Sequence, residues 1–390
     1  MNQTFDFDQI IDRSGTNSVK YNLAGFGRTA DVLPLWVADM DFPAPPCVQH
    51  ALHQRIDHGI YGYSNTDDAY RTTLQSWFSR RFGWEIEPNW LVKTPGVVVA
   101  VHLALHALTR PGDAVLIQEP VYYPFRNAIE RMGRSVVVSE LVYENGAYSI
   151  DFADFEEKIA TQNVRLFILC SPHNPVGRVW RKDELLRMGE ICRRHGVLVV
   201  SDEIHMDFIA SGHQHHVFAS LSPDFADFTI TCTAPSKTFN LAGLQLSNIF
   251  ISNETLRKSF RSAYKYFGMD EPGLMGVVAC QAAYSEGEPW LEQLLTYLAE
   301  NVVFLRSYLQ EHLPQVHLVE PEGTYLAWLD CKALNLDDAA LDDLISNKAK
   351  LWLDDGPMFG PAGSGFQRVN LASPRSVLEQ ALRRLTAALK

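Results

Sequence analysis

The sequence predicts an α/β protein with a large domain built on a mostly parallel, doubly wound sheet and a smaller α+β domain. Three apolar runs, 165–170, 196–200 and 228–232, are typical of buried strands, and polar residues follow each of them at once. A predicted amphipathic helix over 183–195 separates the first two runs, and such strand–helix–strand alternation favours parallel pairing. A long amphipathic pattern over 289–312 then carries the chain into the smaller domain.

Glycine, proline and the hydrophobic period predict the remaining elements in chain order. The first thirty residues are expected to form an irregular arm, and three prolines delay the first helix until residue 47. Gly59 closes that helix, and the next helix places Leu74, Trp77 and Phe78 on one face. Helices are expected over 47–58, 67–82, 95–105, 151–160, 183–195, 255–267, 274–285, 289–312, 341–347 and 375–389. Strands are expected over 33–37, 90–94, 114–118, 134–141, 165–170, 196–200, 228–232, 247–252, 316–319, 324–329 and 365–369.

The order of these elements predicts how the chain is divided. Residues 1–50 are expected to be an amino-terminal arm and a segment that packs on the small domain. Residues 51–288 would form the large, ligand-binding domain and residues 289–390 the small carboxyl-terminal domain. A chain of 390 residues has room for both cores.

Composition excludes several classes of function. The protein has 46% hydrophobic and 21% charged residues, as ordinary globular proteins do. A net charge of −12 argues against a nucleic-acid partner, because phosphate backbones require a basic face. The sequence has neither a signal-peptide core nor an apolar run of membrane-spanning length, and its six cysteines show no CxxC spacing. We therefore expect a cytoplasmic protein with free thiols and no membrane partner.

Polar side chains follow the three predicted central strands. They are Asn174, Asp202 and Lys237, in that order along the chain. In an open α/β sheet, ligands bind at the carboxyl ends of the strands. Pyridoxal 5'-phosphate (PLP) requires a lysine for its Schiff base and an acid beside its pyridinium nitrogen. Any one of these residues alone would more often be solvated or cap a helix, but their succession predicts a PLP site with Lys237 and Asp202 in those two roles.

Longer motifs around these residues resemble one family. They are VADMDFPAP (37–45), GIYGYS (59–64), CSPHNPVGRVW (170–180), SDEIHMDF (201–208), PSKTFNLAGLQ (235–245) and FQRVNLASPRSVLE (366–379). Together they resemble the MalY/PatB group of C–S β-lyases within the fold-type I PLP-dependent transferases, the aspartate aminotransferase superfamily. The resemblance runs from about residue 5 to the end of the chain. It implies PLP-dependent β-elimination from cystathionine or a cysteine S-conjugate, giving a thiol, pyruvate and ammonia, in a homodimer whose strand 247–252 is antiparallel.

The resemblance also implies a role for each site residue. Lys237 would carry the cofactor and act as the catalytic base, Asp202 would pair with the ring nitrogen, and Asn174 would bind the phenolic oxygen. Tyr122 would stack on the ring, and Arg368 would bind the substrate carboxylate with help from Tyr122 and Asn174. The other expected cofactor contacts are the backbone of Gly96, Val97 and Val98, the side chains of Ser236 and His205, and Tyr63 from the neighbouring subunit.

For several of these roles, the residues alone are also consistent with an ordinary structural role. Gly96 begins a strongly apolar helix, whose free N–H groups would suit a phosphate but also fit a plain buried helix start. Tyr63 has Tyr61 as a rival, and both fit an ordinary packed aromatic pair. Arg368 by itself is equally a surface arginine. A run of three histidines at 213, 215 and 216 lacks further ligands at a suitable spacing, so we expect a solvated loop and no metal site.

Three departures from the aminotransferase pattern bear on the activity. His205 stands where aminotransferases have tyrosine, Ala234 where they have serine and Gln245 where they have arginine. The serine and arginine normally hold the cofactor phosphate, so their absence shifts that task to the helix start and to Tyr63. The departures favour the lyase branch. The alternatives are a class I/II aminotransferase and a PLP-containing regulatory protein.

Overall fold

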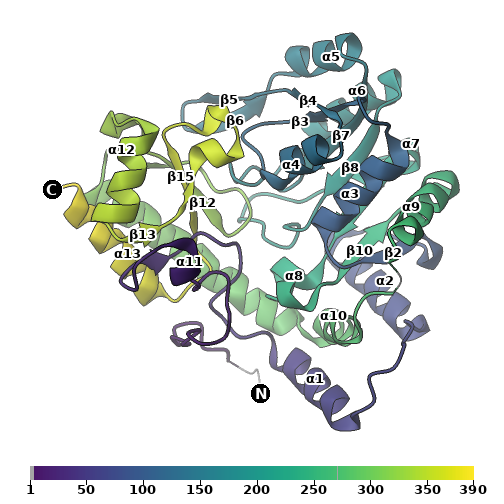
Figure 1. Cartoon of the computed structure of the whole chain (residues 1–390), viewed down its shortest axis with the longest axis horizontal. Helices are drawn as coiled ribbons and strands as arrows, with labels where there is room; N and C mark the ends of the chain where they lie inside the picture. The colour runs from purple at the N-terminus through teal and green to yellow at the C-terminus, as the bar shows by residue number, and fades with distance from the viewer. Residues whose placement is uncertain (1–3, 270) are drawn as a thin grey trace.

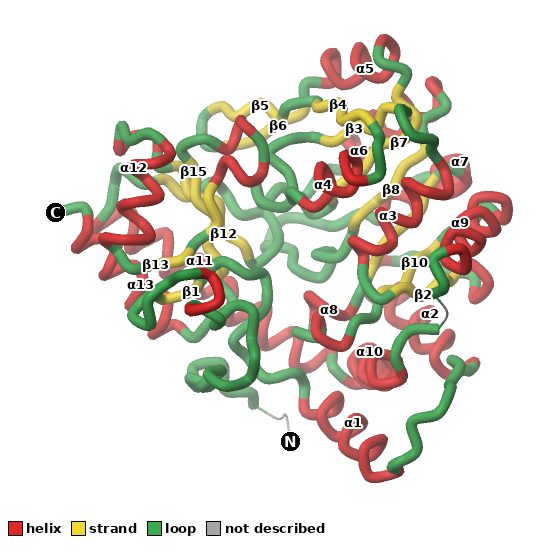
Figure 2. The backbone as a smooth tube through the Cα atoms, viewed as in Figure 1, coloured by secondary structure: helices red, strands yellow, loops and turns green. Residues whose placement is uncertain are grey.

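The computed structural model describes residues 4–269 and 271–390, and its centre is a seven-stranded sheet (Figures 1 and 2). The strand order is β2-β10-β9-β8-β7-β3-β4. The pairings from β9 through β8, β7 and β3 to β4 are parallel, and β10 runs antiparallel to both of its neighbours. The strands are Leu91–Thr94 (β2), Ser247–Phe250 (β10), Thr229–Thr233 (β9), Leu198–Asp202 (β8), Val164–Cys170 (β7), Ala114–Ile117 (β3) and Ser135–Val138 (β4). The mostly parallel sheet and the antiparallel strand are thus confirmed.

Both faces of this sheet are covered by helices, because the strands carry apolar side chains on both faces. In β7, Leu166 and Ile168 belong to one core and Phe167 and Leu169 to the other. The first core includes the inner faces of Val97–Leu108 (α3), Pro124–Arg131 (α4) and Glu254–Tyr266 (α9). The second includes those of Phe152–Thr161 (α5), Lys182–His195 (α6) and Pro223–Asp227 (α7). The sheet is therefore doubly wound.

A third core lies below the sheet edge formed by β2 and β10. It packs Pro46–His58 (α1), Asp68–Phe82 (α2), Leu274–Glu286 (α10) and the start of Glu288–His312 (α11) against one another. Figure 1 shows α1 and α10 side by side at the bottom of the view. The long helix α11 leaves this core and continues into the second sheet's core through Leu305 and Leu309.

The second sheet has four strands in the order β11-β12-β15-β14. They are His317–Leu318 (β11), Leu326–Asp330 (β12), Phe366–Asn370 (β15) and Asp354–Asp355 (β14), with Asp338–Asp342 (α12) and Arg375–Ala388 (α13) packed against them. The short strand Leu33–Pro34 (β1) pairs in parallel with Leu351–Trp352 (β13) on this side of the molecule. The division at residues 50 and 288 remains our proposal for the domain boundaries.

Several element predictions were wrong in detail. The strand predicted over 33–37 ends at Pro34, and the helix α4 was not predicted. The strand predicted over 134–141 ends at Val138, and Leu141–Glu144 (β5) instead forms a hairpin with Ala147–Ile150 (β6). Asn145 and Gly146 make its turn, both with positive φ (51° and 81°). The predicted helix 341–347 begins earlier, at Asp338, and residues 343–348 widen into π-helical geometry. The Asn145–Gly146 pair is itself typical of a hairpin turn. It was overlooked because the apolar residues 134–141 were assigned to one continuous strand.

The histidine-containing loop is only partly solvated. His213 is exposed as expected, but His215 is buried and its Nε2 lies 2.8 Å from Glu203 Oε2. Glu203 also accepts hydrogen bonds from Ser201 Oγ and the Phe218 backbone N–H. The loop prediction was therefore wrong for His215, because the buried carboxylate of Glu203, directly after β8, needs donors.

Two features are absent from the part of the chain that the structure describes. No helix within it is both long and apolar enough to cross a bilayer. No group of three or more His, Cys, Asp or Glu side chains within it is arranged to hold a metal ion.

The packing of α6 yields a stability prediction. An ideal Cβ at Gly189 would lie 2.1 Å from Cε2 of Phe225, whose ring is buried and stacked on Phe218. Alanine favours a helix by about 1 kcal/mol over glycine, but overpacking costs about 1–3 kcal/mol. We expect Gly189→Ala to lower the free energy of unfolding in urea by about 1–2 kcal/mol net. The control is Gly273→Ala, where a Cβ meets nothing within 4 Å. Equal stability of the two variants would contradict this packing.

Candidate active site

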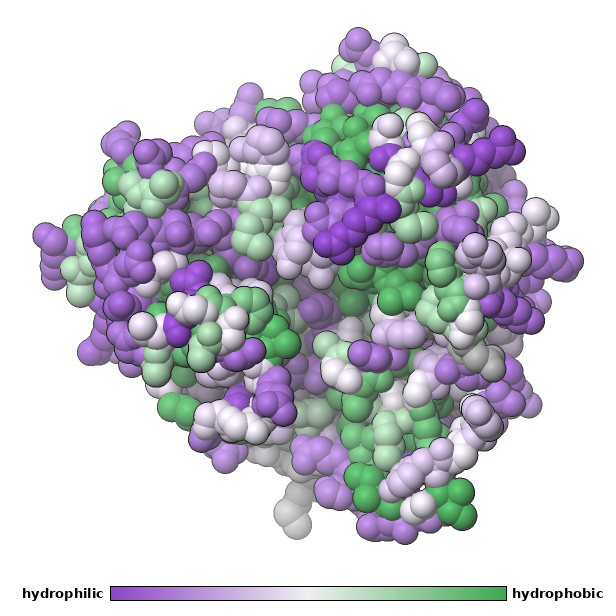
Figure 3. Space-filling view, in the orientation of Figure 1, coloured by the Kyte–Doolittle hydropathy of each residue, from purple (hydrophilic) through white to green (hydrophobic). Residues whose placement is uncertain are grey.

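The predicted site residues meet in a cavity of about 290 Å³. Its lining comes from the carboxyl ends of β7, β8 and β9, from the start of α3, from the second sheet and from an irregular segment at 36–38. Figure 3 shows this face of the molecule hollowed near its middle, between the two sheets. The lining includes Gly96, Val97, Val98, Tyr122, Asn174, Asp202, His205, Ser236, Lys237 and Arg368. Ten of the eleven predicted site residues therefore lie around one cavity.

Lys237 stands on the short helix Pro235–Thr238 (α8), which begins two residues after β9 ends. Its Nζ donates a hydrogen bond to the backbone oxygen of Ala38 at 2.5 Å. Burial lowers the pKa of Lys237 to about 8, and the nearby Arg368 charge acts in the same direction. Asp39 and Asp202 oppose that shift. A lysine in this environment is partly neutral near pH 8, so its amine can accept a proton.

Asp202 is the last residue of β8 and is buried. Burial raises the pKa of Asp202 to about 7, although a hydrogen bond from the Ile204 backbone N–H (3.1 Å) and the Lys237 charge favour the ionised form. A carboxylate that is costly to ionise alone gains a partner when a cationic group binds beside it. Asp202 therefore suits a protonated ring nitrogen.

Arg368 and Asn174 are held together at the side of the cavity. Arg368 Nη1 donates to Asn174 Oδ1 at 2.9 Å, and Nη2 donates to the Trp36 backbone oxygen at 3.0 Å and pairs with Asp354. Asp354 lies directly opposite Arg368 in the β14–β15 pairing, and burial raises its pKa. Arg368 Nε is buried and has no hydrogen-bond partner among the described residues. The guanidinium is thus oriented by three acceptors, and its Nε–H is left unpaired.

Asp354 was not found from the sequence. β14 has only two residues, so its strand period is too short to predict, and an Asp-Asp-Gly stretch is typical of a turn. Residues 36 and 37 were predicted to end a strand that in fact stops at Pro34, and the residues alone assigned no chemistry to the loop that follows them. Only the pairing of distant segments brings both to the cavity.

The start of α3 offers the cavity a cluster of unpaired backbone donors. The first N–H groups of a helix have no intrahelical partner, and the helix dipole is positive there. Gly96 precedes the helix in extended geometry, and a Cβ built on it would meet nothing within 4 Å. The space next to Gly96, Val97 and Val98 is therefore open to an anionic group such as a phosphate.

Tyr122 and His205 supply rings to the cavity wall. The Tyr122 backbone N–H donates to the Asn174 oxygen at 3.0 Å, and burial raises the pKa of its phenol. Burial strongly lowers the pKa of His205, so the imidazole is neutral, and its Nδ1 is buried without a partner among the described residues. A planar ligand with polar atoms at its edges, as PLP has, fits these walls.

Tyr63 is the one predicted site residue outside the cavity. Its side chain is fully exposed (111%) in the irregular stretch after α1. The hydroxyl of its rival, Tyr61, donates to the Ile56 backbone oxygen of its own chain at 3.0 Å. Ile56, Ile60 and Tyr61, which lie near Tyr63 in the sequence, are also exposed. A contact from Tyr63 to a neighbouring subunit's cofactor stays a prediction.

The comparisons with known proteins agree with this geometry. The aminotransferase class I and II family model matches residues 30–385. The chain is 46% identical over 386 residues to cystathionine β-lyase PatB of Bacillus subtilis, covering 98% of this chain and 100% of that protein. It is 35% identical over 390 residues to protein MalY of Escherichia coli, covering 99% of each.

Solved structures give the same result. Cystalysin from Treponema denticola, solved with its PLP cofactor, superposes with a TM-score of 0.97 at 38% identity, covering 99% of each chain. The PLP-bound C–S lyase from Staphylococcus hominis superposes with a TM-score of 0.93 at 36% identity, covering 99% of this chain and 98% of that one. The fold predicted from the sequence is thereby confirmed.

The raised pKa of Asp202 predicts how pH affects the cofactor-free protein. An unfolded chain protonates aspartate near pH 4, about three units below the folded value of about 7. Between these values the folded state holds the extra proton, so this carboxyl destabilises the protein progressively as pH rises. In urea unfolding, Asp202→Asn should therefore gain stability over the parent at about pH 8 and much less at about pH 5. The control is Asp57→Asn at an exposed carboxyl. A gain that does not depend on pH would contradict the burial of Asp202.

Proposed function

We propose, from the premise that this chain belongs to the aminotransferase class I and II family, that it is a PLP-dependent C–S β-lyase. Its substrate would be L-cystathionine or a related cysteine thioether, and its products a thiol, pyruvate and ammonia. The observation that carries the proposal is the meeting of Lys237, Asp202, Asn174 and Arg368 around one cavity. The chain in which they meet resembles proteins named as cystathionine β-lyases over nearly its full length.

We assign each chemical group of PLP to the residues whose environment would suit it. The backbone of Gly96, Val97 and Val98 would bind the phosphate, with Ser236 nearby. Asp202 would face the ring nitrogen, and Asn174 the phenolic oxygen. Tyr122 would lie against the ring, with His205 also at its edge. Lys237 would carry the cofactor through Nζ. When bound, PLP supplies an electron sink for the pair released when the substrate's Cα–H bond breaks.

Arg368 would fix the substrate at its carboxylate. The guanidinium is oriented by Asn174, the Trp36 carbonyl and Asp354, and its Nε remains free to donate. A carboxylate bound by an oriented arginine places Cα at a set distance from the neighbouring side chains. Once the substrate's amino group had replaced it on the cofactor, the freed Lys237 amine would take the Cα proton. The electron pair of the broken Cα–H bond would then expel the β-thiolate, and water would hydrolyse the remaining three-carbon fragment to pyruvate and ammonia.

The departures at His205, Ala234 and Gln245 favour this activity over transamination. Ala234 and Gln245 remove two side chains with which aminotransferases hold the phosphate, and the neutral, buried His205 replaces a phenol. The family in the broad sense contains both activities, so the distinction rests on these positions and on the named relatives.

The deciding experiment compares turnover with and without a keto-acid acceptor. The PLP-loaded protein is incubated with L-cystathionine, and pyruvate and free thiol are both assayed. Equal release of the two without an acceptor is the expected result. Turnover that needs the acceptor would make the protein an aminotransferase. Absence of turnover despite bound PLP would favour a regulatory protein.

Lys237 provides the most direct test of the site. Without its amine, the Cα proton loses its base, and general-base catalysis contributes about 10²–10⁴-fold. We expect Lys237→Ala to reduce pyruvate release from cystathionine by at least about 10²-fold. The matched control is Lys258→Ala, which removes an exposed lysine on α9 and should leave the rate unchanged. Comparable rates for the two variants would remove Lys237 from this role.

We further propose a homodimer in which Tyr63 reaches the cofactor phosphate of the partner. The support is its full exposure in a stretch of the sequence where Ile56 and Ile60 are also exposed, together with the hydrogen bond that occupies the rival Tyr61 within its own chain. Tyr63→Phe should lower PLP affinity about tenfold, the scale of one hydrogen bond to a charged group. Tyr61→Phe is the control and should change PLP affinity little, as measured by equilibrium dialysis.

Subunit mixing tests whether Tyr63 acts across the dimer. Lys237→Ala and Tyr63→Phe subunits each lack one part of the site, and a mixed dimer restores one complete site if Tyr63 serves the partner. Mixing should therefore raise activity at limiting PLP above that of either parent. An unchanged sum of the parental activities would place Tyr63 outside the partner's site.

We also place this enzyme in the cytoplasm. Its six cysteines are free thiols, five of them buried, as is common in a reducing compartment. The proposal would fail if fractionation of the source cells recovered the protein outside the cytoplasm.

A further inference from the structure

An irregular strap, residues 36–42, closes one side of the cavity and is held almost entirely by side chains. The backbone oxygens of Trp36, Val37, Ala38, Asp39 and Met40 all accept side-chain hydrogen bonds. The donors are Arg368, Asn370, Lys237, Tyr325, Lys20, Arg13 and Asn240. A backbone segment without strand pairing keeps its position only while these donors keep theirs.

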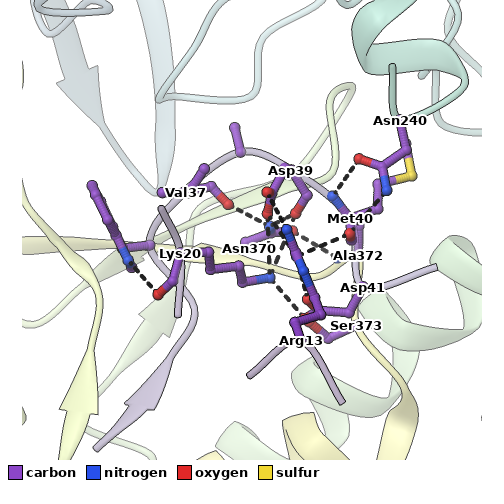
Figure 4. Close-up of polar contacts among 12 residues, drawn as sticks. Arg13, Lys20, Val37, Asp39, Met40, Asp41, Asn240, Asn370, Ala372 and Ser373 are labelled. Atoms are coloured by element: carbon purple, nitrogen blue, oxygen red, sulfur yellow. Dashed lines mark hydrogen bonds and ion pairs between the residues drawn. The ribbon is translucent and has the colours of Figure 1, made fainter. Parts of the chain in front are cut away.

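A cluster of four charges, two of them on the strap itself, lies beside the strap backbone (Figure 4), and none of the four lines the cavity. We call Arg13, Lys20, Asp39 and Asp41 the charge cluster. Lys20 is completely buried and its Nζ lies 2.7 Å from Asp41 Oδ2, while Arg13 binds Asp39 at 2.7 Å and Asp41 at 2.8 Å. The cluster thus balances two positive charges against two negative ones inside the protein.

The charge cluster also joins distant parts of the chain. Ser373, just beyond β15, donates to Asp41 Oδ2 at 2.6 Å, and the Asp41 N–H donates to the Ala372 oxygen at 2.9 Å. Asn240, three residues after Lys237, exchanges hydrogen bonds with the Met40 backbone in both directions. The strap is therefore fixed to the second sheet and to the Lys237 segment at once.

The strap presents one atom to the catalytic lysine. The Ala38 oxygen accepts from Lys237 Nζ at 2.5 Å and from the Tyr325 hydroxyl at 2.9 Å. A carbonyl in this place orients the amine and stabilises its protonated form. A shift of the strap by a fraction of an ångström would move this acceptor.

We infer that the charge cluster positions the strap for the reaction, so that Lys20 and Asp41 control the catalytic lysine through the Ala38 carbonyl. The expected change in kcat rests on the proposed function, whereas the expected change in the pKa of Lys237 does not. Neither residue lines the cavity, so both are positioning residues and not catalytic ones.

Burial makes the cluster sensitive to the loss of either partner. Burial alone would raise the pKa of Asp41, but Lys20 and the hydrogen bonds from Lys20, Ser373 and Arg13 hold it below its usual range. Removing Lys20 leaves Asp41 with Arg13 as its one remaining charged partner in the cluster, and removing Asp41 leaves the buried Lys20 ammonium 3.9 Å from Asp39, so each buried charge is then poorly compensated. A double variant that removes both charges avoids that penalty, while still loosening the strap.

The test uses Lys20→Met, Asp41→Asn and the double variant, with Lys258→Met as the matched control. Lys258 also lies 2.7 Å from a carboxylate, Glu254, but on the exposed surface. Urea unfolding, kcat and KM for cystathionine are measured for each. In addition, the pKa of the Lys237 amine is measured in the cofactor-free protein from the pH dependence of its acetylation, by mass spectrometry of the peptide.

Both single variants should lose stability and reduce kcat by about 10- to 100-fold, with KM less affected. The double variant should recover part of the stability while kcat stays low. Loss of the Ala38 acceptor should lower the pKa of Lys237 in all three variants, because it removes a contact that favours the ammonium. Of the other charged groups facing this amine, Arg368 and Asp202 lie outside the strap, as does the neutral His205. Asp39 belongs to the strap and favours the ammonium, so its displacement would lower the pKa of Lys237 in the same direction.

Two results would overturn the inference. One is a kcat that recovers together with stability in the double variant, because the cluster would then be structural only. The other is an unchanged pKa of Lys237 in all variants. If the parent protein itself released no pyruvate, the proposed function would fail, and the lysine titration would still decide the role of the charge cluster.

Discussion

The in-register parallel pairing of β7, β8 and β9 is the constraint on which the site depends. Cys170 pairs with Asp202, and Asp202 pairs with Cys232, so the three strands end at one level of the sheet. Asn174, Asp202 and Lys237 lie at or just beyond those ends. Asn174 and Lys237, more than sixty positions apart in the sequence, therefore reach one cavity. A slip of one residue in any of these strands would turn its side chains to the opposite face.

Burial of charged side chains is the second constraint, and it affects the ionisable residues that line the cavity. The pKa of Lys237 falls and that of Asp202 rises because both lose water, and each then becomes able to exchange a proton near neutral pH. Arg368 is treated differently. Asp354 and two oxygen acceptors compensate its charge and fix its plane, which leaves a directed donor and not a mobile cation.

The strap, residues 36–42, connects the Lys237 segment to the second sheet through hydrogen bonds. It comes from the beginning of the chain, is held by residues near its end, and touches the lysine in between. The covalent order of the chain gives no hint of this arrangement. Its stability depends on pairing Lys20 and Asp41, which are buried, with each other and with the partly exposed Arg13 and Asp39. The same feature makes the strap rigid in the intact protein and sensitive to single substitutions.

The sequence by itself determined most of the helices and strands, the doubly wound sheet and the succession of Asn174, Asp202 and Lys237, because hydrophobic period, caps and strand ends are local properties. The shorter helices α4, α7 and α8 were not predicted. Gly59 and Gly196 ended their helices where expected. The hairpin at Asn145 and Gly146 was also local and was missed only because an apolar run seemed to continue through it. Tertiary structure alone decided that Asp354 would face Arg368, that Lys20 would be buried against Asp41, and that the Ala38 carbonyl would meet Lys237. Each of these contacts joins segments far apart in sequence, and its energy depends on the exclusion of water, which no local pattern encodes.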